Sequence, residues 1–170
     1  KTGKKYSKLG PGSFSFNSPV GACVKCKGFG KVIEINPQLV VPDPSLTIRQ
    51  GAIKPFEGKV YKNCLQDLLN TCGHYKINPD QPWEKISDKK KELLWHGDPQ
   101  YKEEDGGWYG IKGFFKWLEK KTYKMHVRVF LSKYRGYFEC PDCKGSRFKM
   151  ETEFWRWNNL SLSDLYSMPI

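Results

Sequence analysis

Two copies of one cysteine motif constrain the fold of this chain more than any other feature of its sequence. Residues 23–28 and residues 140–145 both read Cys-x-x-Cys-x-Gly. Two residues between the cysteines let one tight turn aim both sulfurs at a single ion, and the glycine lets the backbone leave that turn in a conformation that other residues resist. Two such pairs supply the tetrahedral four-thiolate set that structural zinc prefers. The predicted zinc ligands are Cys23, Cys26, Cys140 and Cys143.

The distance between the two pairs predicts the architecture. Cys26 and Cys140 have 113 residues between them, which is much longer than the usual zinc-ribbon spacing. A closed four-cysteine site joins distant chain segments and does not activate water. The predicted fold is therefore α+β. A small zinc-clipped base with short strands comprises residues 1–35 and 136–170, and it is interrupted by a largely helical insertion domain over residues 36–135.

Other interpretations of the cysteines remain open. Two independent redox motifs are one, although neither pair lies in a thioredoxin-like βαβ pattern. Two zinc sites completed by His74, His96 or His126 are another, although these histidines show no ligand spacing. Cys64 and Cys72 lie about 12 Å apart along a predicted helix, which is beyond disulfide reach. We expect both to be small buried hydrophobic side chains.

Hydrophobic periodicity and turn residues predict the remaining elements. Helices are expected over 61–72, ended by Gly73, and over 87–95, capped by Ser87 and followed by Gly97. A long helix is expected over 111–134. The other expected elements are a strand over 31–35, extended or turn geometry over 36–45, an acidic surface loop over 98–107, a strand or hairpin over 148–160 and a terminal helix over 162–168.

The expected long helix has two opposed faces. Its apolar stripe follows the spacing of a buried face and comprises Ile111, Phe114, Phe115, Leu118, Thr122, Met125 and Val129. Its basic residues recur every fourth position, so they form a ridge on the opposite side, with Lys121 beside it. The predicted DNA-binding residues are Lys112, Lys116, Lys120, Lys121, Lys124 and Arg128.

The charge of this region favours a polyanionic partner. The whole chain carries a formal net charge of +11, and residues 111–149 hold eleven Lys and Arg against three acidic residues. A solvated helix face usually mixes signs, whereas stacked like charges need a counter-charge such as the phosphate backbone. We predict double-stranded DNA as the partner, with little sequence preference. An acidic protein would satisfy the same charges.

Four aromatic residues are candidates for stacking on exposed bases: Trp108, Tyr109, Tyr134 and Tyr137. The chain contains six tryptophans, and tryptophan in such numbers more often fills a core. We therefore favour a core role for most of these rings.

Several functional classes lack support in the sequence. No Gly-x-x-x-x-Gly-Lys-Ser/Thr loop, Gly-x-Ser-x-Gly elbow or His-Glu-x-x-His motif is present, so we expect no catalysis by this chain alone. Its apolar runs are short and broken by charge, so no membrane span is expected. No signal peptide is visible and the first residue is Lys1. We expect a fragment of a longer protein.

Residues 14–23 read Phe-Ser-Phe-Asn-Ser-Pro-Val-Gly-Ala-Cys. This run, the second cysteine motif through Arg147 and the stretch 160–170 resemble UvrA, the damage-sensing ATPase of bacterial nucleotide excision repair. Residues 45–53 and 123–129 look most like UvrA-like paralogues. The resemblance covers nearly the whole chain.

The resemblance implies a zinc module of the first ATPase half, held by Cys23, Cys26, Cys140 and Cys143, and interrupted by an insertion domain that helps to grip DNA. It implies full-length relatives that dimerise, hydrolyse ATP with Mg²⁺ and, in the repair proteins proper, pass damaged DNA to UvrB. The ATPase motifs and the UvrB-binding insert are expected outside this chain. The paralogue-like stretches leave a non-repair role open. A protein-interaction module is the alternative, because the motif also resembles the zinc domain of DnaJ-type chaperones, which carries four closely spaced copies.

Overall fold

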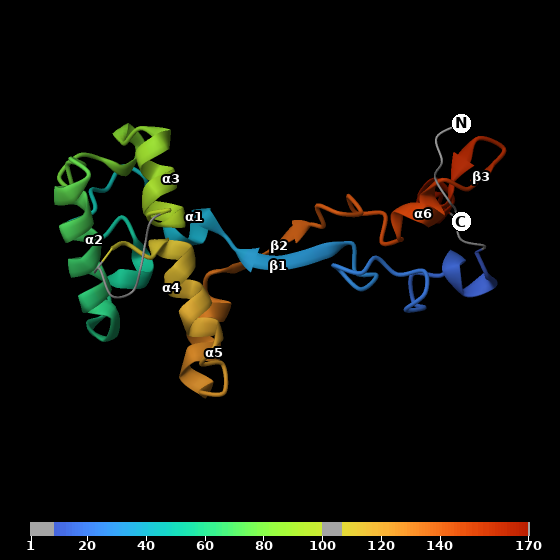
Figure 1. Cartoon of the computed structure of the whole chain (residues 1–170), viewed down its shortest axis with the longest axis horizontal. Helices are drawn as coiled ribbons and strands as arrows, with labels where there is room; N and C mark the ends of the chain where they lie inside the picture. The colour runs from blue at the N-terminus through green and yellow to red at the C-terminus, as the bar shows by residue number, and fades with distance from the viewer. Residues whose placement is uncertain (1–8, 100–106, 170) are drawn as a thin grey trace. The chain divides into compact units, whose positions relative to one another are not determined.

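The structure, a computed structural model, describes residues 9–99 and 107–169. The chain divides into two compact units (Figure 1). One unit combines Lys1–Glu34 with Tyr137–Ile170, and the other comprises Ile35–Gly136. The first contains the cysteine motifs and short strands, and the second is largely helical, so the predicted α+β class is confirmed. Most of the loop expected over 98–107 lies outside the described residues.

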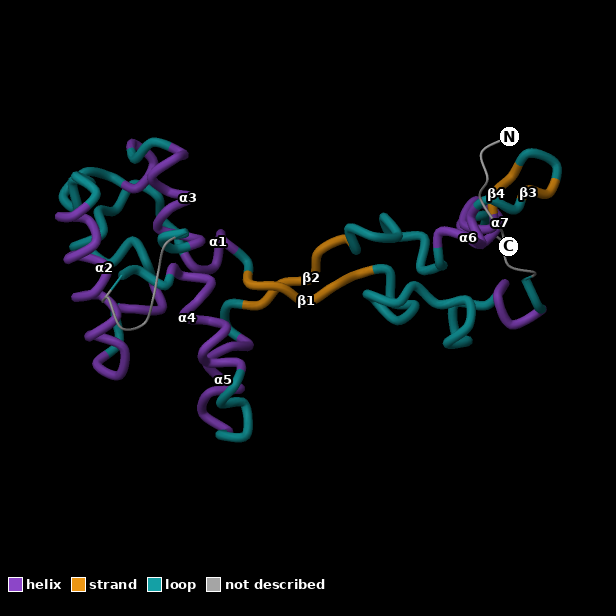
Figure 2. Tube along the Cα trace, in the orientation of Figure 1, coloured by secondary structure: helices purple, strands orange, loops and turns teal. Residues whose placement is uncertain are grey.

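Strands β1 (Lys31–Ile35) and β2 (Arg135–Glu139) pair in a two-stranded sheet, which Figure 2 shows as two neighbouring orange segments. At one end of the pair, the Cys140 N–H donates to the Gly30 carbonyl at 2.9 Å. At the other end, the Asn36 N–H donates to the Tyr134 carbonyl at 2.8 Å. The strands are therefore antiparallel, and the strand expected over 31–35 is confirmed.

The helical unit is built from α1 (Pro37–Val40), α2 (Lys62–His74), α3 (Asp88–His96), α4 (Gly110–Glu119) and α5 (Met125–Ser132), with 3₁₀ turns η2 (Lys54–Phe56), η3 (Lys59–Tyr61) and η4 (Trp83–Lys85). The helices expected over 61–72 and 87–95 are confirmed as α2 and α3. Gly73 lies inside α2 and does not end it, and the Ser87 side chain makes no cap hydrogen bond. Within residues 9–99 and 107–169, no helix has the length and apolar character that a membrane span requires.

The segment expected to be extended or turned after β1 contains the short helix α1. The Asn36 side chain accepts a hydrogen bond from the Gln38 N–H at 2.9 Å, and Pro37 occupies the first helical position. Both features favour a helix start, and they outweigh the restriction that the following prolines impose.

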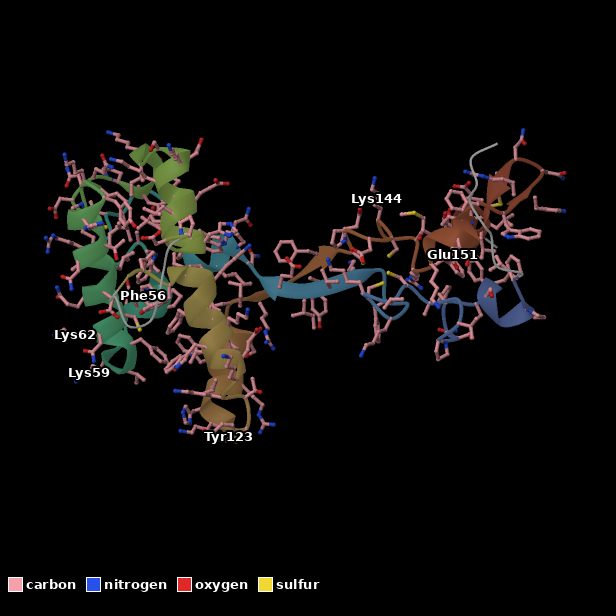
Figure 3. All side chains as sticks on the ribbon, viewed as in Figure 1. Phe56, Lys59, Lys62, Tyr123, Lys144 and Glu151 are labelled. Carbon is pink, nitrogen blue, oxygen red and sulfur yellow. The ribbon has the colours of Figure 1, made fainter. Side chains whose placement is uncertain are left out.

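The core of the helical unit includes aromatic rings that were candidates for base stacking. Trp108 is only 1% exposed, and its Nε1–H donates to the Leu94 carbonyl at 2.8 Å. Phe56, labelled in Figure 3, packs its ring 5.0 Å from that of Phe114. Tyr134 is also buried. Trp108 and Tyr134 therefore belong to the core and are not available to a nucleic acid.

The long helix expected over 111–134 is wrong. The helix α4 ends at Glu119, a turn covers Lys120–Lys124, and α5 starts at Met125. In the turn, the Thr122 hydroxyl donates to the Glu119 carbonyl at 3.0 Å, a local bond that competes with helix continuation. The new helix has its own phase, so Val127 is buried instead of the expected Met125 and Val129. The first half of the expected stripe, Ile111, Phe114, Phe115 and Leu118, is buried as predicted.

The cysteine-containing unit has η1 (Pro11–Phe14), α6 (Met150–Glu153), β3 (Arg156–Trp157), β4 (Leu160–Ser161) and α7 (Leu162–Ser167). Strands β3 and β4 are antiparallel, with Trp157 opposite Leu160. The hairpin expected over 148–160 is thus confirmed at its end, whereas residues 150–153 are helical. The expected terminal helix is confirmed as α7, which begins with a capping box between Ser161 and Asp164.

Candidate metal centre and nucleic-acid interface

The structure brings the four cysteines of the two motifs together. Their sulfur atoms all lie within 4.8 Å of one another, with Cys23 Sγ 3.9 Å from Cys140 Sγ and Cys26 Sγ 3.6 Å from Cys143 Sγ. These separations are too long for disulfides, whose sulfurs lie about 2 Å apart. A tetrahedron of sulfurs about 2.3 Å from a zinc ion has edges of about 3.8 Å. The four cysteines therefore form a set that could hold one metal ion.

The two cysteine motifs fold into matching turns, which we call the knuckles. In each knuckle, the residue after the second cysteine donates its N–H to the carbonyl of the first: Lys27 to Cys23 at 2.7 Å, and Lys144 to Cys140 at 2.8 Å. The chain then enters the left-handed region, where glycine is favoured. The left-handed residues are Lys27, Gly28 and Gly30 in the first knuckle and Lys144, Gly145 and Arg147 in the second.

Gly30 and Arg147 occupy equivalent positions with different chemistry. Their φ angles are 74° and 72°, and the Gly30 N–H donates to Cys26 Sγ at 3.2 Å. A left-handed backbone costs a non-glycine residue about 1–2 kcal/mol. The Arg147 guanidinium lies over the Phe16 ring, 4.9 Å from its centroid. This cation–π contact offsets part of the backbone cost in the second knuckle.

Burial and backbone dipoles act on the thiols in opposite directions. Burial raises the pKa of the Cys23 and Cys143 thiols above that of an ordinary cysteine. Burial also acts on Cys140, but the N–H groups of Cys143 and Asp142 donate to its sulfur and hold its pKa below the ordinary value. Such donors stabilise a thiolate, which is the form that binds metal.

Backbone pairing fixes the cluster inside its unit. The Cys23 N–H donates to the Arg147 carbonyl at 2.8 Å, and the Lys149 N–H donates to the Gly21 carbonyl at 3.0 Å. A Cβ added to Gly21 would lie 2.4 Å from the Ser13 carbonyl oxygen and 2.5 Å from that of Ser15. Only glycine fits there, so the run that precedes the first knuckle packs directly against the knuckle's entry.

The other candidate ligands lie elsewhere. His74, His96 and His126 are exposed, and among the described residues the metal-ligand cluster contains none of them. Cys72 is fully buried and Cys64 half-buried, both as free thiols. Burial raises the pKa of Cys72 to about 11.

The six predicted DNA-binding residues, which we call the basic strip, do not lie on one helix. Lys112 and Lys116 are on α4, Lys120 is its C-cap residue, Lys121 and Lys124 lie in the turn, and Arg128 is on α5. The predicted continuous ridge is therefore wrong. Five of the six are exposed, and Lys121 is half-buried.

The basic strip lacks compensating carboxylates in the part of the chain that the structure describes. None of its six cations forms an ion pair there, and the neighbouring Glu119 pairs with Arg135 at 2.9 Å. Positive charge in this arrangement attracts an external anion.

Two aromatic rings lie among these lysines. The Lys121 Nζ lies 3.5 Å from the centroid of the Trp117 ring, and the Lys124 Nζ lies 5.6 Å from that of Tyr123. Trp117, Lys116 and Lys120 also line a groove of about 600 Å³. The stacking candidates chosen from the sequence omitted both rings, although their position between lysines was a usable signal.

Fold and site together define a protein with a cysteine-knuckle unit that is interrupted in the sequence by a basic, largely helical unit. Residues 36–122 match the family model of the UvrA DNA-binding domain, and this segment is just over half of the chain. The chain belongs to the UvrA family.

Individual relatives agree with this family. UvrABC system protein A of Staphylococcus epidermidis is 32% identical over 88% of this chain and 17% of its own length. The protein of the same name from Listeria innocua is 31% identical over 99% of this chain and 19% of its own length. The crystal structure of UvrA2 from Deinococcus radiodurans has the same fold, with a TM-score of 0.61 and 24% identity over 90% of this chain and 21% of that one. The chain thus spans about a fifth of the length of these relatives.

Proposed function

We propose that this chain is the DNA-binding module of a UvrA-type protein and that it holds duplex DNA through the phosphate backbone. The observation that carries the proposal is the basic strip, whose six cations have no carboxylate partner among the described residues. Four of the six lie inside the segment that matches the DNA-binding domain family. Lysine contacts to phosphate position a protein on DNA without reading its sequence.

A structural zinc ion on Cys23, Cys26, Cys140 and Cys143 completes the proposal. The sulfur separations of 3.6 Å and 3.9 Å support it, because they are close to the edges of a zinc–sulfur tetrahedron. Four thiolates close the coordination sphere, so the ion would crosslink the two chain segments and would not activate water. In this proposal residues 1–35 and 136–170 are the zinc-module base, and residues 36–135 are the insertion domain.

The chain itself is proposed to be a binding module and not an enzyme. The parent protein would hydrolyse ATP with Mg²⁺, dimerise and, in a repair role, pass damaged DNA to UvrB in the bacterial cytoplasm. The names of the relatives as UvrABC system components support this role.

A protein-interaction role outside repair is the second candidate. The cysteine-containing unit exposes Met150, Trp155 and Trp157, at 68%, 57% and 66% respectively. A contiguous exposed apolar patch is typical of a surface that contacts protein, and these three side chains lie within eight residues of the chain. This surface lies on other residues than the basic strip, so both roles can be tested separately.

The first experiment measures the affinity of the zinc-loaded chain for a labelled duplex. Changing Lys116, Lys120 and Lys124 together to Glu should weaken binding by more than about 10-fold, since each lost phosphate contact removes counterion release. The control changes the exposed residues Lys31, Lys85 and Lys89 to Glu, which alters the net charge equally. Equal affinities for wild type and the strip variant would exclude the basic strip as the DNA contact.

A further inference from the structure

We infer that the turn between α4 and α5 binds unpaired nucleobases, with Trp117 and Tyr123 as stacking residues. This inference rests on the proposed DNA-binding function and adds a substrate class to it. The preferred ligand would be DNA in which a few bases have lost their partners, and not an intact duplex.

The first observation is that large apolar side chains are exposed on a strongly cationic turn. Tyr123 is 74% exposed and Met125 73%, and Trp117, one turn before the end of α4, is 46% exposed. Figure 3 shows Tyr123 at the turn that joins the two helices. A turn that only positioned lysines on phosphates would not need exposed rings.

The second observation is that each ring carries an ammonium group that a phosphate could attract. Lys121 Nζ lies 3.5 Å from the Trp117 centroid, and Lys124 Nζ lies 5.6 Å from that of Tyr123. At exposed sites such cation–π contacts are weak. When a strand binds, the flexible lysines can move to its phosphates, and the ring faces that they leave can accept bases.

The groove beside Trp117 has the chemistry of a nucleotide site. Its lining combines the apolar or aromatic side chains of Cys64, Tyr109, Phe114 and Trp117 with the positive charges of Lys116 and Lys120. A flat base can pack on the apolar side chains of the groove while its phosphate contacts the lysines. An acidic peptide would neutralise the lysines without stacking on the aromatic rings.

Paired DNA cannot use these rings. In an intact duplex both faces of each base are covered by its neighbours, so the lysines contact phosphates and the aromatic side chains gain nothing. Stacking on one ring typically strengthens binding by at least about 5-fold. The chain should therefore bind a duplex containing a short unpaired bubble at least about 5-fold more tightly than the same duplex fully paired.

The test compares these two labelled duplexes across a salt series, with the zinc-loaded 170-residue chain. Tyr123→Ala and Trp117→Ala should each reduce the preference for the bubble and leave the affinity and salt dependence of paired duplex binding unchanged. Tyr123→Phe should keep the preference, because the ring face remains. Trp157→Ala is the matched control, since Trp157 is an aromatic side chain that is 66% exposed on β3, outside the basic strip.

Two results would overturn the inference: no preference for the bubble in wild type, or the same preference after both alanine changes. Failure of the proposed function looks different. If the proposed function is wrong, changing Lys116, Lys120 and Lys124 to Glu will leave the duplex affinity unchanged. If only the stacking inference is wrong, the same change will still weaken duplex binding.

Discussion

The Sγ atom of Cys26 lies 3.6 Å from the Sγ atom of Cys143, although the two residues are 117 positions apart in the sequence. The β1–β2 pairing supports this approach, because the Cys140 N–H donates to the Gly30 carbonyl beside both knuckles. Each knuckle is shaped by its local sequence, and the strand pairing sets the two knuckles opposite each other.

Removal of the second knuckle's thiols should remove the metal. Cys140→Ser with Cys143→Ser should reduce bound zinc from about one ion per chain to none and unfold the cysteine-containing unit. Among the described residues, Val32 is the one hydrophobic side chain besides the cysteines themselves that belongs to this cluster. Elemental analysis measures the zinc, and hydrogen exchange of the two units measures the unfolding. Cys64→Ser, outside the cluster, should retain the ion. Full zinc occupancy in the double variant would contradict the proposed ligands.

Gly21 should be intolerant of any side chain. Gly21→Ala would place a Cβ within 2.8 Å of three carbonyl oxygens, so the segment must shift, at a cost of about 1–3 kcal/mol in the free energy of unfolding. Gly10→Ala is the control in the same unit, because a Cβ there has no heavy atom within 4 Å. Chemical denaturation of both variants measures the difference. Equal stabilities would show that the run does not pack as described.

The sequence was sufficient where local chemistry decides the structure. The cysteine motif needs a left-handed residue after its second thiol, and Gly28 and Gly145 both adopt that conformation. The apolar and β-branched residues Val32, Ile33 and Ile35 likewise predicted strand β1 from its own sequence. The α+β class followed from these features together with the spacing of the two motifs.

The sequence was insufficient where tertiary packing or a single hydrogen bond decides. The stretch 111–134 keeps a helical period across the Lys120–Lys124 turn, so periodicity alone could not reveal the break. Trp108 directly follows the segment 98–107, which was expected to be a surface loop. Its Nε1–H nevertheless donates to the Leu94 carbonyl inside the core. The position of Trp117 and Tyr123 between lysines was visible in the sequence, but their exposure, which distinguishes them from the buried Trp108, comes from the structure.

The helical unit should lose stability in alkali through Cys72. Burial raises the pKa of this thiol from 9.0 to about 11, so the unfolded chain releases the proton first and stability falls as the pH rises from 9 to 11. The expected loss from this group is about 2 kcal/mol by pH 10.5. Chemical denaturation at pH 8 and at pH 10.5 measures the free energy of unfolding of wild type and Cys72→Ala. Between these pH values the variant should lose about 2 kcal/mol less than wild type. Identical losses of stability in wild type and Cys72→Ala would contradict a raised pKa for the buried Cys72 thiol.

The most direct test of phosphate binding by the basic strip is the salt dependence of duplex affinity. Lys116, Lys120 and Lys124 changed together to Gln remove three cations without adding negative charge. If each contacts a phosphate, the slope of log affinity against log salt concentration should become shallower by about 2.7. The same change at Lys31, Lys85 and Lys89 should leave the slope as in wild type. A wild-type slope in the strip variant would contradict the account.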